Sequence, residues 1–304
     1  MSKTVTVVIS SYKGSKNITR QLDSIFEQID VIPSVFIRDD HSPDDTIDVI
    51  RSYIEKYPDR HIEIVEGENE GYAKSFWDAL RLSGESDYYA FSDQDDVWYP
   101  DKLIKSIKPM EESDYQGPKL SYCKMQRSDE SLNRLDEQVD VISPEKLTKK
   151  LCLTQTFNYG AATVFNREAK DLICRCFPEQ DDIPHDFWAG LLCYWFGKVF
   201  YVNEELYYWI RYGTSVTGEG TNKSGRAYRI KKSMNKKSYP NVARELKEYY
   251  SDLLSVSDKE FIDMLINYKH SFKSKMKLLF DSSFKRKKFT GTIVLKLGIL
   301  FNWY

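Results

Sequence analysis

The 304-residue chain predicts an α/β fold, a mostly parallel sheet with helices on both faces, followed by a basic helical appendage. In the first hundred residues, short β-branched or aromatic runs alternate with segments that repeat apolar residues at helical spacing. Such alternation favours a parallel sheet, because parallel strands are usually joined by helical crossovers. The appendage is inferred from the distribution of charge. Residues 221–304 hold 19 basic and 7 acidic side chains, whereas the whole chain holds 44 basic and 46 acidic ones.

Four strand and helix pairs are predicted in the amino-terminal half. The strands cover residues 5–10, 35–38, 62–65 and 88–91, and the helices cover residues 16–29, 44–57, 72–82 and 102–110. The first strand is rich in Val and Ile, which favour strands. In the first helix Ile18, Leu22 and Ile25 recur on one face. Pro100 and Asp101 mark the beginning of the fourth helix.

The pattern is weaker between residues 113 and 160. A strand is predicted over residues 120–125, and the polar stretch 127–138 is expected to be a lid or an acceptor-binding insertion. Regular structure resumes after this stretch, with strands over residues 161–165 and 198–202 and helices over residues 168–176 and 186–196. A polar linker at residues 213–225 then leads into the basic C-terminal region, which we call the basic tail. We therefore predict two domains, residues 1–220 and residues 221–304.

The cysteines and the amino terminus bear on the compartment. Five cysteines form no Cys-x-x-Cys pair, so reduced thiols in the cytoplasm are the simplest expectation. The first residues have the pattern of a strand rather than of a signal peptide. No apolar run approaches the roughly 20 residues of a membrane span.

The basic tail is predicted to form amphipathic helices. Phe272, Met276 and Phe280 recur at helical spacing, while lysines crowd the remaining positions. One interpretation is binding to an anionic membrane, peripherally at the inner face of the plasma membrane. The other is a helix packed on its own domain with a solvated face. Nucleic acid is not expected as a partner, because no nucleic-acid motif accompanies the charge.

An acidic cluster follows the strand over residues 88–91. Asp93, Asp95 and Asp96 fall within four positions, and carboxylates that close repel one another. A divalent cation bound to a diphosphate would supply the missing charge, because Mg²⁺ and Mn²⁺ prefer oxygen ligands. An acidic, solvated turn is the alternative. The position favours a nucleotide site, since ligands of open α/β sheets bind beyond the carboxyl ends of the strands.

Three further polar segments follow the other predicted strands, namely residues 10–12, 39–42 and 69–71. Together with Asp-Gln-Asp at 93–95, in this order and spacing, they resemble the nucleotide-binding half of the inverting family-2 glycosyltransferases of GT-A fold. The resemblance covers about residues 4–218. The Ser-Asp-Gln-Asp-Asp-x-Trp and Pro-His-Asp-Phe-Trp segments are most similar to the rhamnosyltransferase-like subgroup.

The resemblance implies roles for individual residues. Asp95 would bind the metal, and Asp93 would contact the metal or the ribose. Asp186 would be the catalytic base, although it is also placed to be an ordinary helix cap. The residues implied in binding the nucleotide or donor are Ser10, Ser11, Tyr12, Asp40, Asn69, Gly71, Lys74, Asp93 and Arg211. Those implied in the acceptor or sugar pocket are Asp96, Gly160, Ala161, His185 and Trp188.

One position departs from the family pattern, because Tyr212 stands where many members have a histidine that binds metal or diphosphate. Arg211 could instead pair with phosphate oxygens. The implied reaction moves a sugar from a nucleoside diphosphate, dTDP-rhamnose or otherwise a UDP-hexose, to a hydroxyl of a saccharide or lipid-linked saccharide. It would use Mn²⁺ or Mg²⁺ in bacterial surface polysaccharide synthesis. Two alternatives stay open, a catalytically degenerate membrane-bound scaffold and a sugar nucleotidyltransferase.

Overall fold

The computed structural model describes residues 2–135, 139, 141–178, 183–212 and 238–303. The chain forms two compact units. The first comprises Met1–Lys146, Phe157–Phe177 and Pro184–Tyr212, and the second comprises Leu147–Thr156, Pro178–Ile183 and Gly213–Tyr304. The boundary that we predicted at residue 220 lies outside the described residues and stays a prediction.

The first unit is built on an eight-stranded sheet with the order β3-β2-β1-β4-β7-β6-β8-β5. Its strands are β1 (Lys3–Ser11), β2 (Val31–Asp39), β3 (Ile62–Glu66), β4 (Tyr88–Ser92), β5 (Val97–Trp98), β6 (Lys119–Ser128), β7 (Thr163–Asn166) and β8 (Lys198–Ile210). Strands β3, β2, β1 and β4 run parallel, and so do β6 and β8. Strand β7 is antiparallel to β4 and β6, and β5 is antiparallel to β8. The predicted mostly parallel α/β fold is confirmed.

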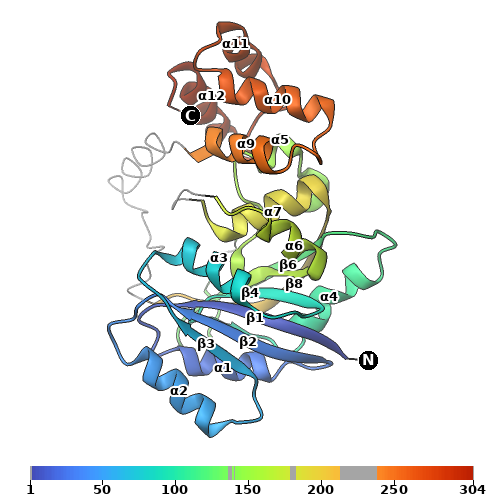
Figure 1. Cartoon of the computed structure of the whole chain (residues 1–304). Coiled ribbons are helices and arrows are strands. Elements are labelled where there is room, and N and C mark those ends of the chain that lie inside the picture. Colours follow the sequence, from blue (N-terminus) through green and yellow to red (C-terminus); the bar gives the residue numbers. More distant parts are fainter. Residues whose placement is uncertain (1, 136–138, 140, 179–182, 213–237, 304) are drawn as a thin grey trace. The chain divides into compact units, whose positions relative to one another are not determined.

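Helices cover both faces of the sheet, as Figure 1 shows for α1 and α2 on one face and α3 and α6 on the other. The helices of this unit are α1 (Ile18–Phe26), α2 (Thr46–Lys56), α3 (Tyr72–Leu82), α4 (Lys102–Glu111), α6 (Arg167–Cys174) and α7 (His185–Phe196), with short 3-10 turns η1 (Pro144–Lys146) and η2 (Gly160–Ala162). Because helices cover β1 from both sides, Val5, Val7, Val8 and Ile9 are all fully buried.

Strands β2 and β8 extend furthest beyond their predicted bounds. Strand β2 begins at Val31 and includes Pro33, whose register partner is Val5 of β1. The pairing of β2 with β3 starts only at Val35, so Pro33 lies where one side of the strand has no partner and its missing N–H costs little. Strand β8 continues to Ile210 because irregularities in its pairing with β6, around Lys124, let the ladder resume.

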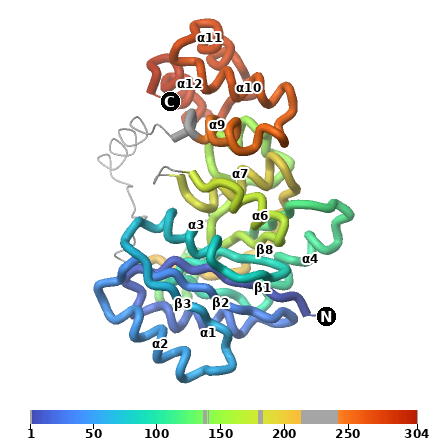
Figure 2. The backbone as a smooth tube through the Cα atoms, viewed as in Figure 1, coloured from blue at the N-terminus to red at the C-terminus, as the bar shows by residue number. Residues whose placement is uncertain are grey.

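The second unit is helical, as predicted for the basic region. Its helices among the described residues are α5 (Lys149–Cys152), α9 (Ser238–Tyr249), α10 (Val256–Asn267), α11 (Phe272–Phe280) and α12 (Phe289–Leu300). Figure 2 shows the last four in orange and red. Phe261 and Phe284 meet in its core at 5.4 Å between ring centroids. The ion pair between Lys149 and Asp258 ties α5 to α10. In the described part of the chain, no helix has the length and apolar character needed to cross a membrane.

Candidate functional site

The carboxyl ends of β1, β2 and β4 lie side by side at one edge of the sheet. In the strand registers Ser11 is opposite Asp39 and Ile9 is opposite Ser92. The buried carboxylate of Asp39 accepts hydrogen bonds from the Ser11 hydroxyl and from the backbone and side chain of Ser42. The edge that we predicted therefore exists, and Asp39 holds two of its loops together. Ser10 is half-buried in β1 next to this edge.

Arg38, which sequence reasoning missed, organises the second loop. Its buried guanidinium pairs with Asp40 at 2.7 Å, with Glu70 at 3.0 Å and with Asp78 at 3.5 Å. The pairing partner Asp40 also accepts the backbone N–H groups of Glu70 and Gly71, both at 2.9 Å. Since a carboxylate offers about four acceptor positions, most of Asp40 is already engaged within the protein. Its predicted contact with a nucleotide stays a prediction.

The loop before α3 is fixed by the same network. The side-chain amide of Asn69 donates to the Asp40 carbonyl at 3.0 Å. Gly71 has φ of 85°, a left-handed conformation that glycine adopts without strain. Lys74 is exposed and pairs with Glu70 at 3.1 Å. The predicted donor loop is thus anchored on Asp40 and Arg38, with the Lys74 ammonium at the protein surface.

Gln94 joins the first and fourth strand ends and was also missed. Its side-chain amide accepts from the Tyr12 N–H at 2.9 Å and donates to the Tyr12 carbonyl at 2.8 Å. A Cβ atom on Gly14 would lie 2.3 Å from the Gln94 Oε1, so this contact requires glycine. The Tyr12 ring is partly exposed beside these bonds. The Asp-Gln-Asp segment is therefore tied to the loop after β1.

The predicted acids converge at this edge. Burial, together with repulsion from Asp95 and Asp186, raises the pKa of Asp93 to about 7. Burial raises the pKa of Asp95. Burial also raises the pKa of Asp186 to about 6, although hydrogen bonds from the backbone N–H groups of Phe187 and Gly160 act in the opposite direction. Two segments about ninety residues apart thus bring carboxylates within electrostatic reach. Clustered carboxylates with raised pKa values are typical of functional sites.

Asp96 lies beneath this cluster, beside a buried lysine. Burial and repulsion from Asp93 and Asp95 hold the pKa of Asp96 well above its usual range, while Lys102 opposes the shift. Neither the Asp96 Oδ2 nor the Lys102 Nζ has a hydrogen-bond partner among the described residues. The Lys102 ammonium lies 3.5 Å from the centre of the Trp98 ring, and burial lowers its pKa to about 8. Asp96 is thus buried, and its predicted place in the acceptor or sugar pocket stays a prediction.

His185 occupies an aromatic cage. Its ring stacks on Phe76 at 3.8 Å and meets Phe91 edge to face at 4.6 Å. Both ring nitrogens are buried without hydrogen-bond partners in the described structure, and burial lowers the pKa of His185 to about 3. A Cβ on Gly160 would lie 2.6 Å from the His185 Nε2, so the glycine makes room for the ring. His185 is therefore neutral.

Two predicted pocket residues belong to the core. Trp188 is fully buried, and its indole N–H donates to the Cys176 carbonyl at 2.9 Å. Ala161, in η2, is buried in the hydrophobic core. Neither side chain is accessible in this structure, and their predicted place in a sugar pocket stays a prediction.

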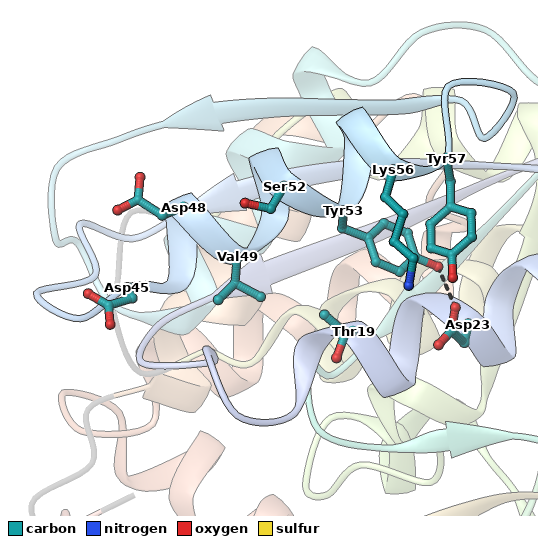
Figure 3. Close-up of a pocket in the computed structure, with 9 residues that line it drawn as sticks. All are labelled: Thr19, Asp23, Asp45, Asp48, Val49, Ser52, Tyr53, Lys56 and Tyr57. Atoms are coloured by element: carbon teal, nitrogen blue, oxygen red, sulfur yellow. Dashed lines mark hydrogen bonds between the residues drawn. The ribbon is translucent and has the colours of Figure 1, made fainter.

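A cavity of about 580 Å³ opens between α1 and α2 (Figure 3). It is lined by Thr19, Asp23, Asp45, Asp48, Val49, Ser52, Tyr53, Lys56 and Tyr57. None of the predicted site residues is among them. Volume alone does not identify the chemistry of a site, so we assign the site from the clustered carboxylates.

Comparison with known proteins decides the family. The sequence profile described as "Glycosyl transferase family 2" matches residues 6–173, more than half of the chain. The chain belongs to glycosyl transferase family 2. It is thus a transferase, and the resemblance drawn from its strand ends is confirmed at the level of the family.

Named relatives of this family-2 chain are glycosyltransferases. It is 40% identical over 103 residues to the dTDP-rhamnosyl transferase RfbG of Shigella flexneri, a match that covers 33% of this chain and 35% of RfbG. It is 30% identical over 165 residues to the putative teichuronic acid biosynthesis glycosyltransferase TuaG of Bacillus subtilis, covering 54% of this chain and 62% of TuaG. The chain therefore spans between about a third and about two thirds of these relatives.

Solved structures support the same fold. The S. aureus protein TarS, residues 1–349 in complex with UDP-GlcNAc, aligns with a TM-score of 0.58 at 15% identity, over 99% of this chain and 80% of that one. The mannosyltransferase PcManGT from Pyrobaculum calidifontis, in complex with GDP-Man and Mn²⁺, aligns with a TM-score of 0.54 at 17% identity and the same coverage. The GT-A fold of this family-2 transferase is confirmed.

The acidic cluster fits a divalent cation that is shared with a substrate. Across the residues that the structure describes, no group of three or more His, Cys, Asp or Glu side chains could hold a metal ion by itself. Mg²⁺ commonly binds one or two carboxylates and takes its other ligands from phosphates and water. Asp93 and Asp95 offer oxygen ligands of this kind.

Tyr212 lies against the acidic loop, at the position where the family pattern has histidine. Its hydroxyl donates to the Asp95 backbone carbonyl at 3.2 Å. Burial and the Asp95 charge raise the pKa of Tyr212 to about 12, so the phenol is neutral and supports the loop. Arg211 is half-buried and lies over the Trp209 ring, 4.8 Å from its centre.

Proposed function

We propose that this family-2 transferase moves a sugar, with inversion, from a nucleoside diphosphate to an acceptor hydroxyl. The observation that carries the proposal is the gathering of Asp93, Asp95 and Asp186 at the carboxyl edge of the sheet, where Asp95 and Asp186 both repel a charge on Asp93. An anionic diphosphate cannot bind there without added positive charge. A sugar nucleotide delivered with a divalent cation meets that requirement.

Asp186 is the proposed base. With a pKa of about 6 it is mostly ionised at neutral pH yet more basic than an ordinary aspartate, which suits proton abstraction. The acceptor oxygen forms a bond to the anomeric carbon as the bond from that carbon to the diphosphate oxygen breaks. The leaving diphosphate keeps the electron pair, and Asp186 takes the hydroxyl proton. Attack from the face opposite the diphosphate inverts the centre.

Asp93 and Asp95 are the proposed holders of Mn²⁺ or Mg²⁺, which supplies positive charge to the diphosphate when bound. The bonds from Gln94 to Tyr12 keep the loop of these acids next to the loop after β1. Tyr212 supports the same loop from the other side through the Asp95 carbonyl. Together these contacts hold both carboxylates at fixed positions before the donor arrives, which lowers the cost of binding it.

The proposed donor is dTDP-rhamnose, with a UDP-hexose as the second candidate. The likeness to the dTDP-rhamnosyl transferase RfbG supports the first, and TuaG supports an acceptor in cell-envelope polysaccharide. We propose a saccharide or lipid-linked saccharide as that acceptor. A lipid-linked acceptor would place the reaction at the inner face of the plasma membrane.

The test is release of nucleoside diphosphate by the full chain with Mn²⁺, comparing dTDP-rhamnose with UDP-hexoses. We expect release from one donor only. Asp186→Asn should lower transfer at least about 100-fold while donor binding persists, because only the base is lost. Asp95→Asn should weaken donor binding in the presence of the metal. Asp48→Asn, on α2, is the matched control and should leave both unchanged.

Transfer at the parent rate by both site variants would refute the assigned roles. Absence of release from every sugar nucleotide, with donor binding intact, would instead support a degenerate scaffold. Formation of a sugar nucleotide from a sugar phosphate and a nucleoside triphosphate would favour the nucleotidyltransferase.

A further inference from the structure

Helix α12 carries a solvent-facing apolar stripe. Phe289, Ile293, Leu297 and Leu300 follow one another at intervals of three or four residues, which places them on one face of the helix. All four are exposed, Phe289 to 78%. The opposite face packs inward through Leu295 and Ile299. The helix is therefore anchored by one apolar face and offers a second to solvent.

Further exposed apolar side chains follow α12 in sequence or lie on α11, the helix that packs against it. Phe301 is exposed and stacks on Trp303 at 4.8 Å between ring centroids. On the neighbouring helix α11, Phe272 and Phe280 are 79% and 80% exposed. We call the whole set the apolar face; it consists of Phe272, Phe280, Phe289, Ile293, Val294, Leu297, Leu300, Phe301 and Trp303. Soluble proteins rarely expose so many large apolar side chains together.

Lys296 does not interrupt this face, although the sequence suggests that it would. Its ammonium turns inward and donates to the carbonyl of Leu278 at 2.5 Å and to that of Asp281 at 2.8 Å. These are carbonyls at the end of α11 that lack helical partners. The Lys296 ammonium, which interrupts the apolar sequence of α12, thus joins α12 to the end of α11.

Positive charge surrounds the apolar face. Residues 268–304 contain nine Lys and Arg residues and a single acid, Asp281. That acid is already paired with Lys150 at 2.6 Å. Lys273 and Lys277 are exposed on α11, and Lys285, Lys287 and Lys288 are exposed just before α12. The combination of exposed apolar side chains with a net excess of basic residues is that of an interfacial membrane helix.

We propose that the apolar face and these five lysines form a docking surface for an anionic lipid bilayer. The aromatic and aliphatic side chains would enter the boundary between headgroups and acyl chains, while the lysines meet the lipid phosphates and carboxylates. Charge decides against a second copy of the chain as the occupant, because two such surfaces would repel each other. The inference goes beyond sugar transfer and does not depend on it.

The experiment is flotation of the full chain with vesicles. One set is phosphatidylcholine alone, and the other contains about one third phosphatidylserine. We expect binding to the anionic vesicles that weakens as salt screens the charge, and little binding to the neutral ones. A lysine near an anionic surface contributes about fivefold to partitioning, so Lys273→Gln with Lys277→Gln should weaken binding about 25-fold.

Phe289→Ser with Leu297→Ser tests the apolar contribution and should also reduce binding at least about tenfold. Val256→Ser and Lys259→Gln change an exposed apolar and an exposed basic residue of α10, outside the surface, and should bind as the parent does. Thermal unfolding verifies that every variant is folded. Equal binding by all variants, no binding to anionic vesicles at low salt, or a stable dimer that hides the face would overturn the proposal. Vesicle binding without any nucleotide release would refute the transferase alone.

Discussion

Gly14→Ala tests whether the loop after β1 is held by Gln94. The new Cβ would lie 2.3 Å from the Gln94 Oε1 and 2.8 Å from its Cδ, so the amide would have to leave. Gln94 is free to turn toward solvent, because the atoms that clash are at the end of its side chain. The cost of the substitution is then the loss of its two hydrogen bonds to Tyr12.

The magnitude follows from those two bonds. A protein hydrogen bond contributes about 0.5–1.5 kcal/mol net, and both of these are partly exposed, so together they are worth about 1–2 kcal/mol. Gln94→Ala removes the same two bonds and should lower the free energy of unfolding by the same amount. Once Gln94 is truncated, every remaining atom lies at ordinary contact distance from the new methyl group or farther. Gly14→Ala should then cost close to nothing in the Gln94→Ala background.

The assay is urea unfolding of the parent, both single variants and the double variant. We expect a coupling free energy of about 1–2 kcal/mol, because the double variant should be about as stable as either single one. Gly84→Ala is the matched control: a Cβ there meets nothing within 4 Å, so it should change stability little. Additive losses from Gly14→Ala and Gln94→Ala would refute the reasoning, since they would mean that the two residues do not touch.

Two further predictions concern the interior of the site. Gly67→Ala should lower the free energy of unfolding by about 2–4 kcal/mol in urea titrations, since its Cβ would lie 2.5 Å from the Arg38 guanidinium, which three acids hold in place; a loss no larger than that of Gly84→Ala would contradict this. His185→Leu should alter the pH dependence of stability. Because the folded pKa of His185 is about 3 and the unfolded value about 6.5, the unfolded state binds the extra proton between these limits, so the parent loses stability as pH falls below about 6.5. As pH falls through that window, the free energy of unfolding of the variant should rise by about 1.4 kcal/mol per pH unit relative to that of the parent. The same difference in free energy of unfolding between variant and parent at about pH 5 and at about pH 6.5 would speak against it.

The sequence predicted the strand and helix order because local signals there agree with the fold. Strand β1 and helix α1 bury the apolar positions that their periodicity marks, among them Val7 and Leu22. The carboxyl ends of adjacent parallel strands lie at the same edge of a sheet, so the location of Asp40 and Asp93 at one edge followed from topology. Fold and edge were therefore accessible from residue patterns alone.

The hydrogen bonds and ion pairs that hold the loops of this edge together could not be predicted from the sequence. Arg38 and Gln94 act through contacts with loops 32 and 82 residues away, and no periodicity marks a side chain for such a role. Trp188 and Ala161 are buried in this structure, and the pocket role that the resemblance implied for them stays a prediction. Placement at an edge can be inferred from local pattern, whereas partners across loops depend on the register of the folded sheet.

The balance of charge at the edge links the fold to the proposed reaction. Lys102 is the cation that lowers the pKa of Asp96, yet burial brings its own pKa down to about 8, and it lies below the cluster against Trp98. Burial, together with repulsion from Asp95 and Asp186, still raises the pKa of Asp93 to about 7. Among the residues that the structure describes, the site is thus left with too little positive charge. A bound divalent cation would lower the pKa values of Asp93 and Asp95 again, so binding of the cation should release protons at neutral pH and tighten as pH rises.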